Sequence, residues 1–154
     1  MRQPLPPLPL ADAPHAAANE LFARDIRVTI RPAFLPQHSD PTDRSYVWAY
    51  RVRIHNRGER TVQLLRRSWR IIDSVGRARD VSGEGVVGMA PTLAPGEYHD
   101  YTSHCPLETP WGTMEGAYTF RVVKGEDAGT EFIVPVARFY LTPETAKRKR
   151  ETHP

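Results

Sequence analysis

Gly83, Gly85 and Gly88 form the G-x-G-x-x-G pattern found in loops that bind phosphate groups. In a dinucleotide-binding fold, such glycines permit a tight turn and let a pyrophosphate approach the backbone where a helix begins. Two prolines and a glycine follow within residues 91–96, so no helix can start after this loop and a Rossmann site is excluded. The phosphate hypothesis then requires successive backbone N–H groups that bind an anion without a helix.

Two arginines upstream of this loop would supply the positive charge that a phosphate ligand needs. Glu84 lies inside the loop and repels a phosphate unless Arg77 or Arg79 offsets its charge. One hypothesis is therefore a nucleotide or pyrophosphate sensor, in which the three loop glycines supply backbone donors and the two arginines supply countercharge. The alternative is that the glycines serve only a loop or a bulge.

Histidines and the single cysteine are the other side chains that could bind a metal or act as nucleophiles. On an extended strand His99 and Cys105 share one face while His104 lies on the other, so three or four metal ligands do not converge. Cys105 has no adjacent base, because His104 points away from it. We predict no catalytic residue, no metal site and no cofactor, with Cys105 as a buried apolar residue.

Charge is distributed unevenly along the chain, although the formal total is only +3. Residues 51–79 carry nine arginines and two acids, a net charge of +7, whereas residues 80–131 carry two basic groups and nine acids, a net charge of −7. We expect most of these groups to form cross-strand ion pairs, so nucleic acid is not the expected partner. Arg51 and Arg53, on the outer face of one strand, are the predicted contacts of a protein partner.

Alternating apolar and polar residues dominate the region between residues 21 and 143, which we predict to be one domain. The alternation predicts strands over 26–31, 46–55, 62–73, 79–82, 98–105, 114–122 and 131–141. Pro135 indicates that the last strand lies at a sheet edge or contains a bulge. No stretch of ten or more residues has a helical period, so we predict an all-β two-sheet sandwich of about seven or more strands, with a small barrel as the alternative. The predicted core consists of Trp48, Tyr50, Val52, Ile54, Leu64, Trp69, Ile71, Tyr118, Phe120 and Phe132.

The two ends of the chain differ from this domain in composition. Residues 1–20 contain five prolines and predict a flexible Pro/Ala-rich arm, and residues 144–154 predict a basic tail containing the sequence KRKR. No apolar run approaches the ~18 residues that a membrane-spanning helix needs. Prolines interrupt the first residues, so no secretory signal is expected. We therefore predict a cytoplasmic protein that does not engage a membrane.

An ordered series of short motifs in the central region resembles the ApaG family. The motifs are YVWAY (46–50), VQLL (62–65), GEGVVG (83–88), APGE (94–97), YTS (101–103), ETP (108–110) and GTM (112–114). The resemblance covers about residues 24–142 and implies an immunoglobulin-like or fibronectin-type-III-like sandwich in a bacterial cytoplasmic protein. It also implies an association with cobalt sensitivity and magnesium/cobalt efflux, and related eukaryotic domains look like interaction modules.

From the residues and the resemblance together we predict a non-catalytic binding module that engages a protein partner or a small ligand. The sheet faces and the 83–88 loop are the expected contact regions. A sensor of nucleotide or pyrophosphate at that loop is the alternative, and the same glycine motif has prompted a pyrophosphate-binding suggestion for the family. Exposed edge strands would also let two sandwiches pair weakly as a homodimer.

Overall fold

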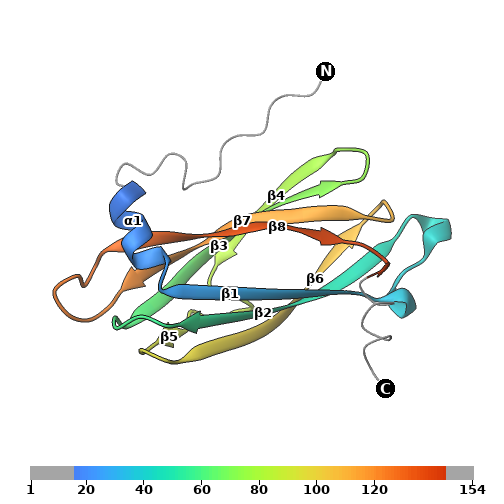
Figure 1. The fold of residues 1–154 in the computed structure, drawn as a ribbon. Helices are drawn as coiled ribbons and strands as arrows, with labels where there is room; N and C mark the ends of the chain where they lie inside the picture. Colours follow the sequence, from blue (N-terminus) through green and yellow to red (C-terminus); the bar gives the residue numbers. More distant parts are fainter. Residues whose placement is uncertain (1–15, 145–154) are drawn as a thin grey trace.

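The computed structural model describes residues 16–144 as a sandwich of two antiparallel β-sheets (Figure 1). One sheet has the order β1-β2-β6, and the other has the order β4-β3-β7-β8 with the short β5 paired to β3. This confirms the predicted all-β sandwich. The strands are β1 (Ile26–Phe34), β2 (Tyr46–Asn56), β3 (Val62–Asp73), β4 (Ala78–Glu84), β5 (Thr92–Leu93), β6 (Tyr98–Leu107), β7 (Gly112–Val122) and β8 (Glu131–Leu141).

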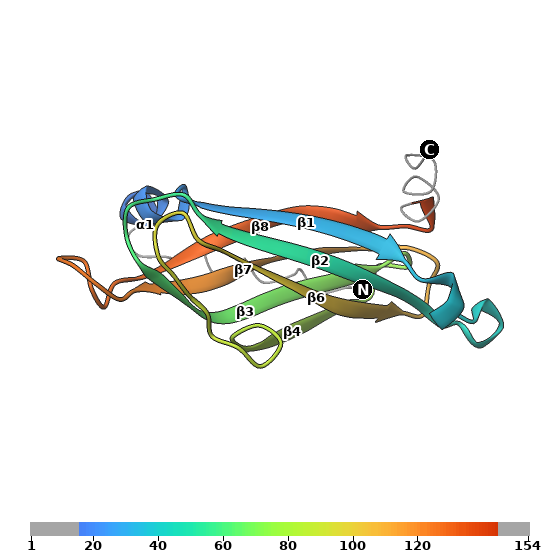
Figure 2. The same cartoon turned by 90° about the horizontal axis from the view of Figure 1, so that it is seen from below.

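Period-two alternation explains how each strand divides its side chains between the core and the surface. In β2, Trp48, Val52 and Ile54 are fully buried, while Arg51 and Arg53 between them point to solvent. All ten residues of the predicted core are buried between the sheets, as expected. The strands β1, β2 and β6 form one layer that can be followed in Figure 2.

Strand β8 shows both features that its internal proline predicts. It lies at the edge of the five-stranded sheet, where Pro135 pairs with Ala117 of β7. The β7–β8 register also shifts between Met114 and Gly116, as a bulge requires. A proline in this strand is tolerated because an edge strand has one side on which its missing N–H is not needed.

The short helix α1 (Ala16–Ala23) was not predicted, because eight residues are too few to show a helical period over ten or more residues. The Asn19 side chain accepts a hydrogen bond from the Ile133 N–H (2.7 Å) and donates one to the Ile133 carbonyl (2.9 Å), and so pairs with the free edge of β8. Asn19 thus attaches α1 to the edge of β8, and the predicted domain boundary at residue 21 falls within this helix. The predictions for residues 1–15 and 145–154 lie outside the described residues.

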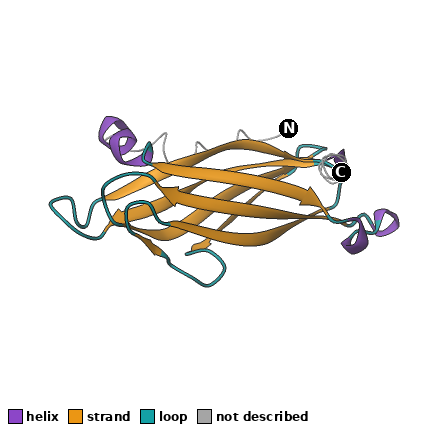
Figure 3. Cartoon of the chain, turned by 60° about the horizontal axis from the view of Figure 1, so that its bottom comes forward, coloured by secondary structure: helices purple, strands orange, loops and turns teal. Residues whose placement is uncertain are grey.

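In the described residues 16–144, helical segments lie at the ends of the sandwich (Figure 3). Two 3-10 turns, η2 (Pro36–His38) and η3 (Pro41–Asp43), connect β1 to β2, and α1 lies at the other end of the sandwich, against β8. No helix within residues 16–144 covers the middle of the three-stranded sheet, where the side chains of Arg51 and Arg53 are 67% and 50% exposed. No helix among residues 16–144 is long and apolar enough to cross a membrane.

Candidate binding surfaces

The Gly83–Gly88 segment comprises the end of β4 and the start of a tight turn. The Val86 N–H donates to the Met89 carbonyl (2.7 Å) and the Met89 N–H donates back (3.0 Å). Val87 and Gly88 between them have φ of 48° and 76°, the left-handed pair of a type I′ turn. The Gly85 N–H donates to the Leu65 carbonyl (2.7 Å), so two backbone donors of this segment are used within the fold. Phosphate binding here stays a prediction.

Arg67 holds this segment from the inner side, a role that the sequence did not indicate. Its Nη1 donates to the carbonyls of Glu84 (3.1 Å) and Gly85 (2.9 Å). The β3–β7 register shifts between Leu64 and Arg66, and this irregularity turns Arg67 toward the core side of the strand. A Cβ at Gly85 would lie 2.1 Å from the Met89 carbonyl oxygen, so the turn cannot close this tightly around a larger residue.

The structure does not bring Arg77 and Arg79 to the glycine loop. They lie at the opposite end of β4, and the six residues from Arg79 to Gly85 span about 20 Å at ~3.3 Å per residue. Arg79 Nη2 donates to the Pro106 carbonyl (2.6 Å) and so bridges the edges of β4 and β6. The two arginines therefore belong to a different region from the three glycines with which they were grouped.

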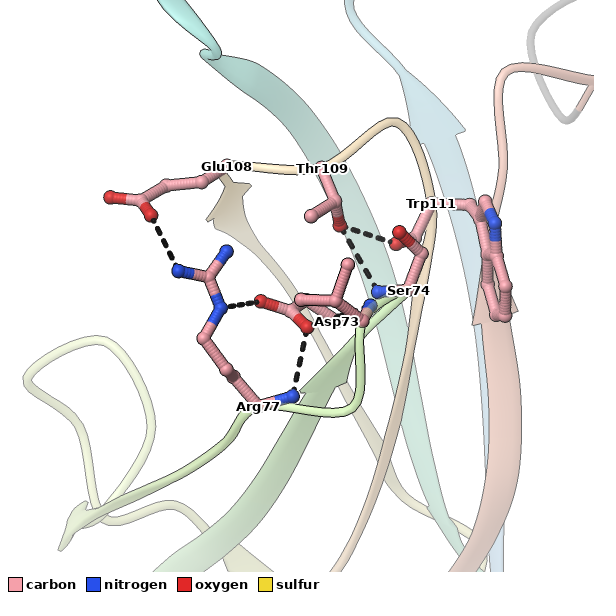
Figure 4. A network of polar contacts seen from close by, with 7 residues as sticks. Asp73, Ser74, Arg77, Glu108, Thr109 and Trp111 are labelled. Carbon is pink, nitrogen blue, oxygen red and sulfur yellow. Dashed lines mark hydrogen bonds and ion pairs between the residues drawn. The ribbon is translucent and has the colours of Figure 1, made fainter.

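A polar network fixes Arg77 at the turn between β3 and β4 (Figure 4). Its Nε donates to Asp73 Oδ2 (2.8 Å), its backbone N–H donates to Asp73 Oδ1 (2.9 Å), and its Nη1 lies 3.4 Å from Glu108 Oε2. Burial alone would raise the pKa of Asp73, but hydrogen bonds from Arg77 and from the Val75 N–H outweigh it and lower that pKa. Thr109 joins the network to the β6–β7 connection by accepting from the Ser74 N–H (3.1 Å).

The outer face of the five-stranded sheet is balanced by cross-strand ion pairs. Four arginines point outward from β3, β7 and β8, and each lies within ion-pair distance of a carboxylate on another strand of the same sheet. This confirms the predicted pairing for this sheet. The pairs are Arg66–Glu131 (2.8 Å), Arg70–Asp80 (2.9 Å), Arg138–Glu115 (2.8 Å) and Arg121–Glu131 (4.0 Å).

The outer face of the three-stranded sheet is not balanced in this way. Four arginines project from it against the single carboxylate of Asp100, and we call this set the arginine face: Arg27, Arg31, Arg51 and Arg53. Arg31 lies directly opposite Arg51 in the β1–β2 register. Together with Thr29, His55 and Asp100, these arginines line a depression of about 440 Å³.

Asp100 pairs with only two of these arginines. Arg53 Nε and Nη2 both donate to its carboxylate at 2.8 Å, and Arg51 Nη2 lies 3.9 Å away. The hydrogen bonds from Arg53 lower the pKa of Asp100. Within residues 16–144, Arg27 and Arg31 have no ion-pair partner, so the face keeps a net charge of +3.

The Cys105 thiol and two tyrosine hydroxyls are enclosed in the core, whereas His99 is half-buried and His104 is exposed. Cys105 is 1% exposed, as predicted, and burial raises the pKa of its thiol, which keeps it protonated and poorly nucleophilic. The hydroxyls of Tyr101 and Tyr118 hydrogen-bond to each other, and burial raises the pKa of both. Across the described part of the chain, no group of three or more His, Cys, Asp or Glu side chains is arranged to hold a metal ion.

Comparison with known proteins gives a consistent result. The ApaG domain model matches residues 36–122. The ApaG protein of Paramagnetospirillum magneticum is 49% identical over 118 residues, which cover 77% of this chain and 88% of that protein. The Bordetella pertussis ApaG protein is 48% identical over 117 residues. The crystal structure of the putative ApaA protein from B. pertussis is 47% identical, covers 77% of this chain and 93% of its own, and superimposes with a TM-score of 0.72.

Proposed function

Because this chain belongs to the ApaG family, as the motif order predicted, and its two sheet faces differ in charge balance, we propose a specific role for it. It is a non-catalytic binding module that holds an acidic segment of a partner protein on the arginine face. One observation carries this proposal: four arginines share the outer face of β1-β2-β6 with one carboxylate, whereas every outward arginine of β3, β7 and β8 has an anionic partner.

The contrast matters because unpaired like charges across strands are unfavourable. Opposite charges on facing strands stabilise a sheet, and like charges directly opposite destabilise it. The five-stranded sheet follows this rule, but Arg31 and Arg51 break it. Departures from local folding rules are expected mainly at functional sites, where a ligand supplies the missing complement.

Asp100 illustrates how the face would hold a partner's carboxylate. Arg53 grips it with two parallel hydrogen bonds of 2.8 Å, the bidentate geometry in which a guanidinium matches a carboxylate. Outward residues two apart on a strand, such as Arg51 and Arg53, are separated by ~6.6 Å. The same spacing separates alternate side chains of an extended peptide, so a segment with acidic residues at every second position would match the face.

Within residues 16–144, the same face offers few aromatic rings to single-stranded nucleic acid. Bases bind to proteins largely by stacking on aromatic rings. Tyr98 is the large exposed aromatic side chain of β6, and the Arg53 guanidinium lies over its ring, 4.0 Å from the centroid. An acidic peptide is therefore the better complement. A cytoplasmic module of this kind would contribute to the cobalt and magnesium efflux implied by the family resemblance through its partner protein.

Charge reversal on and off the face tests the proposal. The protein is cross-linked in a lysate of the source organism, as wild type, as Arg51→Glu/Arg53→Glu, and as Arg24→Glu/Lys124→Glu. The last variant has the same change in charge at two exposed positions off the face. We expect wild type and control to capture the same protein, cross-linked at an acidic segment, and the face variant to lose it. Equal capture by all three, or capture of nucleic acid by the face, would overturn the proposal.

A further inference from the structure

A second basic site lies between the edges of β4 and β6, at the end of β4 that is remote from the glycine loop. Arg44, Arg77 and Arg79 line a hollow of about 520 Å³ there, which we call the β4–β6 hollow. This volume lies within the ~300–1,000 Å³ range of small-molecule sites. Ile71, Ala78, Pro106 and Leu107 supply its apolar wall.

The charges of the hollow are unequally satisfied. Asp73 and Glu108 both form ion pairs with Arg77, so the two carboxylates of the hollow share one guanidinium. Arg44 and Arg79 have no carboxylate partner within the described residues 16–144. The lining carries a net charge of +1, three arginines against Asp73 and Glu108, and its excess positive charge lies on Arg44 and Arg79. Two guanidiniums without a carboxylate partner beside an apolar wall match a ligand with two negative charges on one small group.

The Arg79 guanidinium is held in place before any ligand arrives, and the η3 turn fixes the backbone of Arg44. The hydrogen bonds of Arg79 to the Pro106 carbonyl (2.6 Å) and the Cys105 Sγ (3.8 Å) use Nη2 alone, which leaves donors on Nε and Nη1. Arg44 ends η3 with φ 51° and ψ 47°, a left-handed conformation that is uncommon for residues with a side chain. Strained backbone of this kind is concentrated at binding sites.

We propose that the β4–β6 hollow binds a small phosphate monoester, whose dianionic phosphate lies between Arg44 and Arg79 and whose apolar body packs on Ile71 and Leu107. Arg77 forms the fixed wall beside it, because the network of Figure 4 holds its guanidinium on Asp73. The ligand class follows from charge matching: a carboxylate supplies one negative charge, and a phosphate monoester supplies two above its second pKa of ~6. This site is separate from the arginine face and from the glycine loop.

Titration of isotope-labelled protein with three probes tests the proposal by NMR. The probes are phenyl phosphate, inorganic phosphate and benzoate. Inorganic phosphate lacks the apolar ring and benzoate lacks the second negative charge, so the comparison shows how much each group contributes to binding. We expect phenyl phosphate at millimolar concentration to shift the amides of residues 71–79 and 105–108. Benzoate should bind about tenfold more weakly, because it carries one charge fewer. Phenyl phosphate should also weaken below about pH 6, where it becomes a monoanion.

Two variants locate the binding. Arg44→Gln removes one free guanidinium from an exposed turn and should weaken phenyl phosphate about tenfold, whereas Arg51→Gln/Arg53→Gln on the arginine face should leave its affinity unchanged. An unperturbed spectrum, shifts confined to residues 83–88, or equal binding of benzoate and phenyl phosphate would each overturn the proposal. Inorganic phosphate that binds as tightly as phenyl phosphate would refute the contribution of the apolar wall.

Discussion

Replacing Arg31 with threonine should stabilise the fold, which is the opposite of what loss of an arginine from a charged sheet surface usually does. Arg31 lies directly opposite Arg51 and has no ion-pair partner within residues 16–144. Its removal eliminates like-charge repulsion without breaking an ion pair that the structure contains. If the arginine face binds an acidic partner, this repulsion lowers the free energy of unfolding of the protein when the partner is not bound.

The expected gain follows from Coulomb's law. If the two side chains on facing strands point away from each other, their guanidiniums lie ~7 Å apart, and they repel by about 0.6 kcal/mol in water. Screening reduces this to less than half at ~0.15 M ionic strength, and nearly abolishes it at ~1 M, where the Debye length is ~3 Å. We therefore expect Arg31→Thr to raise the free energy of unfolding by about 0.5 kcal/mol at ~0.01 M ionic strength, with the gain disappearing as salt is added.

Urea denaturation at low and high salt measures the effect, and Arg66→Thr on the balanced face provides the matched control. Arg66 lies 2.8 Å from Glu131, with both side chains about half exposed, so its removal should cost about 0.2–1 kcal/mol at low salt. The two variants share the same chemical change but should differ in sign. Destabilisation of both at low salt would refute the inference that the arginine face is repulsive.

Four further substitutions test other parts of the structure, each by urea denaturation. Gly116→Ala places a Cβ 1.9 Å from the Ser68 carbonyl oxygen and should cost about 3 kcal/mol or more, whereas Gly88→Ala meets open space and should cost about 1–2 kcal/mol for its positive φ. Val87→Asn creates Asn-Gly in the type I′ turn and should stabilise by about 1 kcal/mol, and a loss would contradict the assigned turn. Asp73→Asn should cost about 1 kcal/mol at neutral pH. Because folding lowers the pKa of Asp73, its contribution is present above the unfolded pKa of about 3.8 and lost below it, so the two proteins should converge in acid.

The sheet architecture could be predicted because local patterns determine it. Alternation along β2 identifies Trp48, Val52 and Ile54 as inward residues wherever the strand is placed in the fold. Pro135 similarly marks an edge or a bulge, whichever strand is its neighbour. Both features are determined by the residues within one strand and do not depend on which strands pair with it, so they can be predicted from a single sequence.

The binding surfaces could be predicted only in part, because they depend on pairing between distant segments. Arg51 and Arg53 were correctly placed on an outer strand face, but which arginines have carboxylate partners follows from the register, such as Arg31 opposite Arg51. Arg79 was grouped with the glycine loop by closeness in sequence, whereas an extended strand separates them. No local signal marks the bulge that turns Arg67 inward.

The most direct test of the arginine face is an NMR titration with an extended peptide of alternating glutamate and threonine. We expect amide shifts confined to β1, β2 and β6. We also expect binding to be lost in Arg51→Glu/Arg53→Glu, retained in Arg24→Glu/Lys124→Glu and weakened by salt. Shifts elsewhere on the protein, or equal affinity of the two variants for the peptide, would contradict the claim that this face binds an acidic partner.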